Sequence, residues 1–255
     1  MGKKFFAWSF DDGLEQDKKI IEILKDYGLG ATFHLNSGLF GDKTYEGRIG
    51  NLGMTEKPAA SFRSSGFHLL SYAPHFRIPE DEVAQVYEGY EVASHTCRHV
   101  NLARCKEEER QKEIADDVKT LSEKFGYPVV GFAYPYGAGA KESREVLKAA
   151  GMKYARLART REGFKFPEDP LAMPLSCWHI SPKTFDLLNA FFQTESDEDL
   201  FFLMFAHGYE FDFATDESNW SKFQRICEMV ARHDDVISCS IRDAFLYHEG
   251  KKELQ

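Results

Sequence analysis

Residues 3–35 read KKFFAWSFDDGLEQDKKIIEILKDYGLGATFHL. The opening apolar run predicts a buried strand. Over residues 17–27 the side chains of Ile20 and Leu24 share one face of a helix, and Gly28 follows in the position of a C-terminal cap. The run ATFHL predicts a second strand. A strand, an amphipathic helix and another strand in this order are typical of a βα unit in a parallel sheet.

The same alternation continues through the rest of the chain after one interruption. Further strands are expected at 90–93, 129–133, 154–157, 200–206 and 236–238. Helices are expected at 106–125, 142–149, 182–192 and 218–232, and the segment 241–248 closes the series. With about seven or eight such units, a barrel is favoured over an open sheet. We therefore expect an α/β fold, a distorted (β/α) TIM-like barrel with about seven strands, whose active-site residues lie where strands end.

One segment, from Asn36 to about Glu82, breaks the rhythm because it is rich in Gly, Ser, Pro and aromatic residues. It predicts a loop insertion over one end of the barrel, where binding loops usually lie. Ordinary loop packing is the alternative for each polar or aromatic side chain in it. The candidates for substrate contact in this insertion are Tyr45, Arg63, His68, Tyr72, His75 and Arg77.

Composition excludes several classes of protein. The chain of 255 residues has 41 acidic and 32 basic side chains, a formal net charge of -9, which argues against nucleic acid and against an anionic membrane surface. The five cysteines form no C-x-x-C pair and indicate reduced thiols. The first apolar run meets Asp11 and Asp12 before the core of a signal peptide could be completed, so we expect a cytoplasmic protein, or a secreted one if a signal was removed.

Two adjacent carboxylates follow the first predicted strand, in the segment SFDDG at 9–13. Adjacent carboxylates at the end of a buried strand repel each other unless a cation or a proton relieves them, so Asp11 and Asp12 indicate a metal site. The alternative is a turn that starts the next helix, since Asp-Asp-Gly is also common turn chemistry.

A pair of histidines follows the strand predicted at 90–93, in the segment SHTCRH at 94–99. His95 and His99 are four residues apart, so one helical turn would place both imidazoles within reach of one ion. This spacing alone is weak evidence, and its position after a strand is the stronger argument. Two histidines and one carboxylate are ligands typical of catalytic zinc, which keeps a position open for water.

Two more segments end predicted strands. In FAYPYGAG at 132–139, a proline and a glycine force a turn that can present backbone N–H groups to an oxyanion, although an ordinary loop is the alternative. In LMFAHGYEFD at 203–212, His207 ends an apolar strand. A structural histidine is the alternative to a catalytic one, and Glu210 or Asp212 is close enough in sequence to orient or tune it.

The ordered set SFDDG, SHTCRH, AYPYG and FAHG resembles the polysaccharide deacetylase family, also called the NodB-homology domain or carbohydrate esterase family 4, from about Phe5 to Phe211. The resemblance implies a NodB-type barrel that removes N- or O-linked acetyl groups from a sugar or polysaccharide with a divalent metal. The metal would be zinc, with cobalt, nickel or iron as alternatives. The resemblance also implies Asp12, His95 and His99 as metal ligands, Asp11 as general base, His207 as general acid and Tyr136 as the source of the oxyanion N–H.

The sequence departs from this family in two places. Many members carry an arginine in the third motif that pairs with the base, whereas this chain has Ala133 there. Arg156 or Arg159 could reach in instead, unless each is a surface charge. The Asp-rich fourth motif is also absent, which leaves the group that tunes His207 unassigned. Candidates for the substrate groove or the acetyl pocket are Arg156, Trp178, His179, Tyr134, Leu203 and Phe205.

Three functions remain in competition. The first is a metal-dependent carbohydrate deacetylase whose partner is an acetylated sugar. The second is a hydrolase of small amides or cyclic amides on the same fold, with a small-molecule substrate. The third is a carbohydrate-binding domain with a decayed site, which the missing arginine allows but the complete set of candidate ligands disfavours. Because those ligands come from both sides of the insertion, we expect residues 1–255 to form a single catalytic domain.

Overall fold

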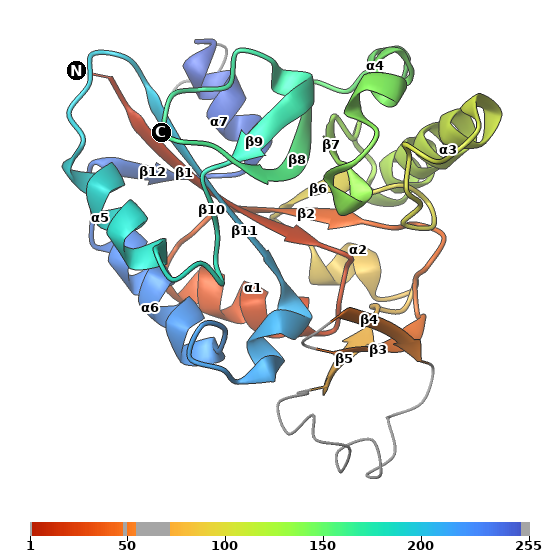
Figure 1. Cartoon of the computed structure of the whole chain (residues 1–255), viewed down its shortest axis with the longest axis horizontal. Coiled ribbons are helices and arrows are strands. Elements are labelled where there is room, and N and C mark those ends of the chain that lie inside the picture. The colour runs from red at the N-terminus through yellow and green to blue at the C-terminus, as the bar shows by residue number, and fades with distance from the viewer. Residues whose placement is uncertain (1, 48–49, 55–71, 251–255) are drawn as a thin grey trace.

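The computed structural model describes residues 2–47, 50–54 and 72–250. Its main sheet consists of parallel strands that curl nearly into a barrel, with helices on the outside (Figure 1). The strand order is β10-β11-β1-β2-β6-β7-β8-β9, and β12 pairs with β1. The strands are β1 (Lys4–Asp11), β2 (Ala31–Leu35), β6 (Glu91–Ser94), β7 (Gly131–Ala133), β8 (Tyr154–Thr160), β9 (Met173–Leu175), β10 (Cys177–Trp178), β11 (Leu200–His207) and β12 (Val236–Ser238).

The two ends of the sheet are joined by β9 and β10, which follow each other in the chain. β9 pairs with β8 at one end of the order, and β10 pairs with β11 at the other. Between them, the Ser176 N–H donates to the Leu203 carbonyl at 3.0 Å. Counting β9 and β10 as one strand and leaving out β12, which lies off this path, the barrel has seven strands, so the expected fold is confirmed.

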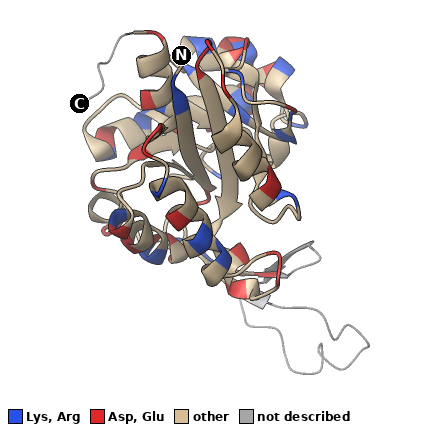
Figure 2. Ribbon diagram, turned by 90° about the vertical axis from the view of Figure 1, so that its left-hand side faces the viewer, with Lys and Arg blue, Asp and Glu red and all other residues tan. Residues whose placement is uncertain are grey.

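Helices cover the outside of the barrel (Figure 1). They are α1 (Gln16–Asp26), α2 (Val83–Val86), α3 (Glu107–Phe125), α4 (Ala140–Ala149), α5 (Thr184–Gln193), α6 (Trp220–Ala231) and α7 (Ile241–His248), with short 3₁₀ turns η2 (Pro135–Gly137), η3 (Pro170–Ala172) and η4 (Gly208–Phe213). Acidic and basic residues are interspersed along these helices in the ribbon view of Figure 2. Within the described part of the chain, no helix is both long and apolar enough to cross a membrane.

Alternate residues of β1 belong to two different cores, as the period of two in a strand requires. Trp8 and Phe10 pack under the outer helices, where the Trp8 ring lies 5.1 Å from that of Phe223 in α6. Phe5 and Ala7 belong instead to the core inside the barrel. Burial on both faces explains why this strand reads as an almost continuous apolar run.

The insertion differs from the irregular loop expected from its composition. Its described part contains three antiparallel strands in the order β4-β3-β5, namely β3 (Lys43–Gly47), β4 (Gly50–Met54) and β5 (Tyr72–Phe76). The Tyr45 and Phe76 rings meet edge to face at 5.1 Å, a cross-strand aromatic pair of the kind that stabilises such sheets. Figure 1 shows this small sheet beside the carboxyl ends of β1 and β2.

Candidate metal and acid–base site

The two adjacent carboxylates lie at the carboxyl end of β1, and the registers place other polar side chains beside them. Asp11 is paired in register with His207 of β11 on one side and with His34 of β2 on the other. Asp12 has φ 80° and so leaves the strand in the left-handed region. Its N–H donates to the His34 carbonyl at 2.9 Å, which fixes this turn. Asp11 and Asp12 are both buried, with 4% and 5% of their surface exposed.

The histidine pair follows β6 in a loop and not in a helical turn, which corrects the expected conformation. Thr96 and His99 both have positive φ, 66° and 54°, which a right-handed helical turn does not contain. The imidazoles still converge, because the centroids of the His95 and His99 rings are 4.8 Å apart. His95 Nδ1 lies 2.8 Å from the Ala133 carbonyl, a contact that requires a donated hydrogen and leaves Nε2 as the free lone pair facing the carboxylates.

Asp12, His95 and His99 are close enough to hold one metal ion. One ligand atom from each lies within 4.8 Å of the others. The nearest approaches are from Asp12 Oδ1 to His99 Nε2 at 3.7 Å and to His95 Nε2 at 4.0 Å. This Oδ1 is buried and has no hydrogen-bond partner within the described structure, a costly arrangement that a cation would relieve. The donor set therefore fits a divalent metal of the zinc type.

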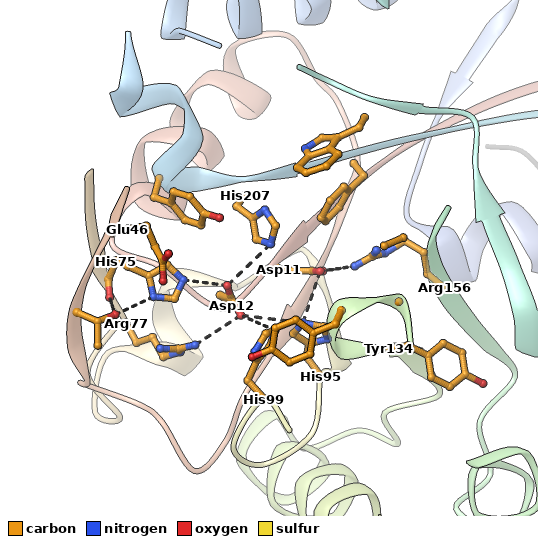
Figure 3. A pocket seen from close by; sticks show the side chains of 17 residues that line it. Asp11, Asp12, Glu46, His75, Arg77, His95, His99, Tyr134, Arg156 and His207 are labelled. Atoms are coloured by element: carbon orange, nitrogen blue, oxygen red, sulfur yellow. Dashed lines mark hydrogen bonds and ion pairs between the residues drawn. The ribbon is translucent and has the colours of Figure 1, made fainter. Parts of the chain in front are cut away.

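The second carboxylate, Asp11, is clamped by a buried arginine (Figure 3). One guanidinium nitrogen of Arg156 donates to both Asp11 oxygens, and the guanidinium lies 4.4 Å above the Phe205 ring. Burial alone would raise the pKa of the Asp11 carboxyl, but the Arg156 charge and the neighbouring imidazoles hold it well below its usual range. Asp11 is therefore ionised at neutral pH.

Arg156 takes the place of the arginine that the family pattern has in the third motif, where this chain has Ala133. Ala133 of β7 and Arg156 of β8 are direct partners in the register of two parallel strands. The guanidinium thus arrives from the adjacent strand at the same level of the barrel. Of the two arginines proposed from the sequence, Arg156 is buried, whereas Arg159 is exposed near the carboxyl end of β8. Arg156 also lines the cavity, where it was expected as a substrate-groove residue.

His207 ends β11 and faces the carboxylates from the opposite side, with Nε2 4.0 Å from Asp12 Oδ2. The ring Nδ1 of His207 lies 3.4 Å from Glu210 Oε1, and the backbone N–H of His207 donates to Glu210 Oε2 at 2.8 Å. Burial alone would lower the pKa of His207, but the Glu210 charge raises it to about 9. Glu210 is therefore the partner that the sequence left open, because Asp212 instead accepts a bond from Gln16 at 2.8 Å.

Glu210 is itself held by two residues proposed from the sequence for the substrate groove. The Trp178 indole donates to Glu210 Oε2 at 3.2 Å, and His179 Nδ1 lies 3.4 Å from the same oxygen. Trp178 lines the cavity, whereas His179 is fully buried behind it. This pair thus fixes the carboxylate that contacts His207.

The insertion contributes two side chains that touch Asp12, a placement that sequence reasoning missed. His75 Nε2 lies 2.9 Å from Asp12 Oδ2, and its Nδ1 lies 3.2 Å from the Thr44 hydroxyl. Arg77 Nη2 lies 3.5 Å from Asp12 Oδ1. The only available signal was their place in a polar insertion, which gave no contact with Asp12. Of the other substrate-contact candidates, Tyr45 packs on Phe76, the side chain of Tyr72 is not described, and Arg63 and His68 lie outside the described residues.

These groups surround one cavity of about 380 Å³. Tyr136, 60% exposed, stands at its rim with φ 58° and contacts the His99 ring at 4.7 Å. Phe205 and Trp178 line it together, with ring centroids 5.5 Å apart. Tyr134 borders the cavity, but its hydroxyl donates to the Leu171 carbonyl at 2.8 Å and its ring points away from the carboxylates in Figure 3.

Leu203 corrects the expectation for the acetyl pocket. It lies two residues before Phe205 on the same face of β11 and is buried in the core inside the barrel. Among the described residues that line the cavity, Phe205 is present and Leu203 is not. The two side chains are separated by one two-residue repeat of the strand, so Leu203 packs in the core directly beneath the cavity wall that Phe205 forms.

The fold and the cavity together define a class of protein. A carboxylate with two imidazoles, a second ionised carboxylate and a carboxylate-linked histidine meet at the carboxyl end of a (β/α) barrel, a combination that suits metal-assisted hydrolysis. The profile of the polysaccharide deacetylase family matches residues 1–155 of the 255. The chain belongs to this family, although the matched region ends just before Arg156 and well before His207. No curated protein matches the sequence.

Solved structures show the same fold at low identity. A proposed polysaccharide deacetylase from Mycobacterium smegmatis is 14% identical, with a TM-score of 0.60 over 100% of this chain and 95% of that chain. The family 4 carbohydrate esterase from Streptomyces lividans, in complex with acetate, is 15% identical, with a TM-score of 0.51 over 92% and 91%. A family 4 pseudoenzyme from Bacillus anthracis is 15% identical, with a TM-score of 0.54 over 94% of this chain and 65% of that chain.

Proposed function

We propose that this protein is a metal-dependent hydrolase that removes acetyl groups from an acetylated sugar. The observation that carries the proposal is that two adjacent carboxylates have different partners. Asp12 turns toward His95 and His99 an oxygen that has no hydrogen-bond partner among the described residues, whereas Asp11 is held apart by Arg156. Family membership supports deacetylase activity, and the geometry supports the individual roles.

Asp12, His95 and His99 would hold the metal. A bound dication polarises a carbonyl and lowers the pKa of water from about 15.7 toward about 7. Asp11, ionised and fixed by Arg156, accepts a proton from the attacking water. The Tyr136 N–H is the donor proposed for the oxyanion. His207, kept protonated by Glu210, donates a proton to the departing nitrogen or oxygen, and acetate and the deacetylated sugar leave.

The test separates the metal site from the base. Asp11→Asn is expected to keep the metal and lose about 100-fold or more in activity, the usual size of a general-base contribution. His95→Ala is expected to lose the metal itself. Asp116→Asn, an exposed change on α3, is the matched control and should alter neither property.

Metal content and acetate release from acetylated sugars are the two measurements. Near-normal turnover in Asp11→Asn would refute its role as base. Unchanged metal content in His95→Ala would refute the metal site. Release of ammonia or acid from small amides, without acetate release from acetylated sugars, would favour an amide hydrolase on the same site.

A further inference from the structure

Arg77 is a buried cation without an adequate partner. Its side chain is only 7% exposed, and its Nε has no hydrogen-bond partner within the described structure. Its one ion-pair contact there is the 3.5 Å approach of Nη2 to Asp12 Oδ1. Arg156, by contrast, donates to both oxygens of Asp11 and packs on an aromatic ring. Burying a charge without close pairing is costly, so Arg77 is poised to accept an anion.

The position of Arg77 is fixed by backbone contacts. Its N–H donates to the Asp42 carbonyl at 2.8 Å, and it forms a bridge with Leu14, just after the two carboxylates. Figure 3 shows the guanidinium on the side of Asp12 opposite Arg156, with His75 and Glu46 nearby. It lines the same cavity as the candidate metal ligands. An anion bound there would lie in the cavity, within one sugar ring of the metal site.

A metal at the proposed site would engage the carboxylate oxygen that forms the one ion pair of Arg77 within the described residues. Asp12 Oδ1 is the oxygen that also faces His95 and His99, so a dication bound among these three groups would claim it. The charged residues lining the cavity are three carboxylates, two guanidiniums and the protonated imidazole of His207. With all six ionised, a bound dication makes their sum positive by two charges. Repulsion between Arg77 and the metal is then relieved by an anionic group on the ligand.

From these contacts we propose that Arg77 forms an anion subsite, and that the substrate is an acetylated sugar carrying a carboxylate or phosphate near its acetyl group. The inference rests on the proposed function for the acetyl part. Glu46 lies on the same wall, and burial raises its pKa to about 7. Its charge would oppose the bound anion, so Glu46→Gln should strengthen anion binding and Arg77→Gln should weaken it.

The first test measures binding without turnover. Glucose 6-phosphate and glucose carry no acetyl group and differ by one phosphate, so their affinities for the zinc-loaded protein are compared by calorimetry. We expect the phosphate to bind at least about 10-fold more tightly, as an added charge-assisted contact allows, and Arg77→Gln to lower this ratio about 10-fold. Arg77→Lys should lower it less because it keeps the charge. The exposed Arg104→Gln, the matched control, should leave the ratio unchanged.

The second test compares acetate release from N-acetylglucosamine, its 6-phosphate and N-acetylmuramic acid. The ratio of kcat/KM for acidic over neutral sugar should fall in Arg77→Gln, whose folding is checked by its Tm. An unchanged binding ratio and an unchanged kcat/KM ratio would overturn the inference while leaving deacetylation intact. Loss of inhibition by free acetate without a change in either ratio would also overturn it, since Arg77 would then serve the acetyl oxygens. Arg77-dependent phosphate binding without any acetate release would refute the proposed function and keep the subsite.

Discussion

The contact between Arg156 and Asp11 should be measurable as a stability coupling. Replacing Arg156 with Met keeps an unbranched apolar side chain over the Phe205 ring, which now lies 4.4 Å below the guanidinium. The change removes the donor to both Asp11 oxygens. What remains near Asp11 are the rings of His34, with Nδ1 at 3.4 Å, and His95, with Nε2 at 3.5 Å.

The magnitude follows from burial. Asp11 is 4% exposed, so Arg156→Met leaves an almost fully buried carboxylate without its counter-charge. Breaking such a pair from one side costs about 3–5 kcal/mol. Asp11→Asn strands the guanidinium instead and is also expected to destabilise. The double variant leaves neither charge, so it should be more stable than the sum of the two single changes predicts, by about 2–3 kcal/mol.

Urea unfolding of the metal-free protein, followed by circular dichroism, gives the four free energies of this cycle. The slope of unfolding free energy against urea must stay equal across the variants for the comparison to hold. A coupling below about 0.5 kcal/mol would mean that the two sites are independent. That result would refute the view that Arg156 is the electrostatic clamp of the base.

Three other predictions concern the surroundings of the site. His75→Ala should weaken metal affinity about 10–100-fold by freeing Asp12 Oδ2, as measured by competition with a chromophoric chelator; equal affinities would rule out this role. Burial raises the pKa of the Asp17 carboxyl to about 8, so the stability that its bound proton contributes at low pH is lost as the pH rises toward 8. Asp17→Asn has no such proton to lose. Between about pH 5 and 8, the free energy of unfolding of the metal-free wild type should therefore fall by about 1 kcal/mol or more relative to that of the variant. Parallel curves of unfolding free energy against pH would contradict this. Glu210→Gln should reduce hydrolysis of an acetamide far more than that of 4-nitrophenyl acetate, whose leaving group needs no proton; equal losses would indicate a merely structural role for Glu210.

Much of the barrel could be predicted because its strands are buried on both faces. The strand at 31–35 and the strand at 236–238 were predicted with the bounds that the structure shows. The strands β9 and β10 were missed because they have only three and two residues, too few for a periodic pattern. The sheet in the insertion was also missed, since its alternation is interrupted by glycines and a bulge.

The residues of the candidate site could be predicted where they lie within a short sequence motif. The contacts between segments that are distant in the sequence could not be predicted. Asp12, His95 and His99 converge as expected, although the loop that joins the histidines is not helical. The choice between two arginines depended on strand register, which a single sequence does not contain. The contact of His75 with Asp12 joins the insertion to the end of β1. No pattern in the sequence predicts this contact, although His75 itself was a candidate.

The central position of β1 has a consequence for how the molecule is made. β1 is paired by β2 on one side and by β11 on the other, so its second long neighbour, which begins at Leu200, is synthesised long after β1 itself. Until then one edge of an apolar strand is open, and long-range parallel pairing is slow. A chain released before β11 would expose that edge and aggregate, and would not persist as a weak enzyme. If the proposed metal binds, its loading should therefore follow translation of β11, even though the first candidate ligand is Asp12.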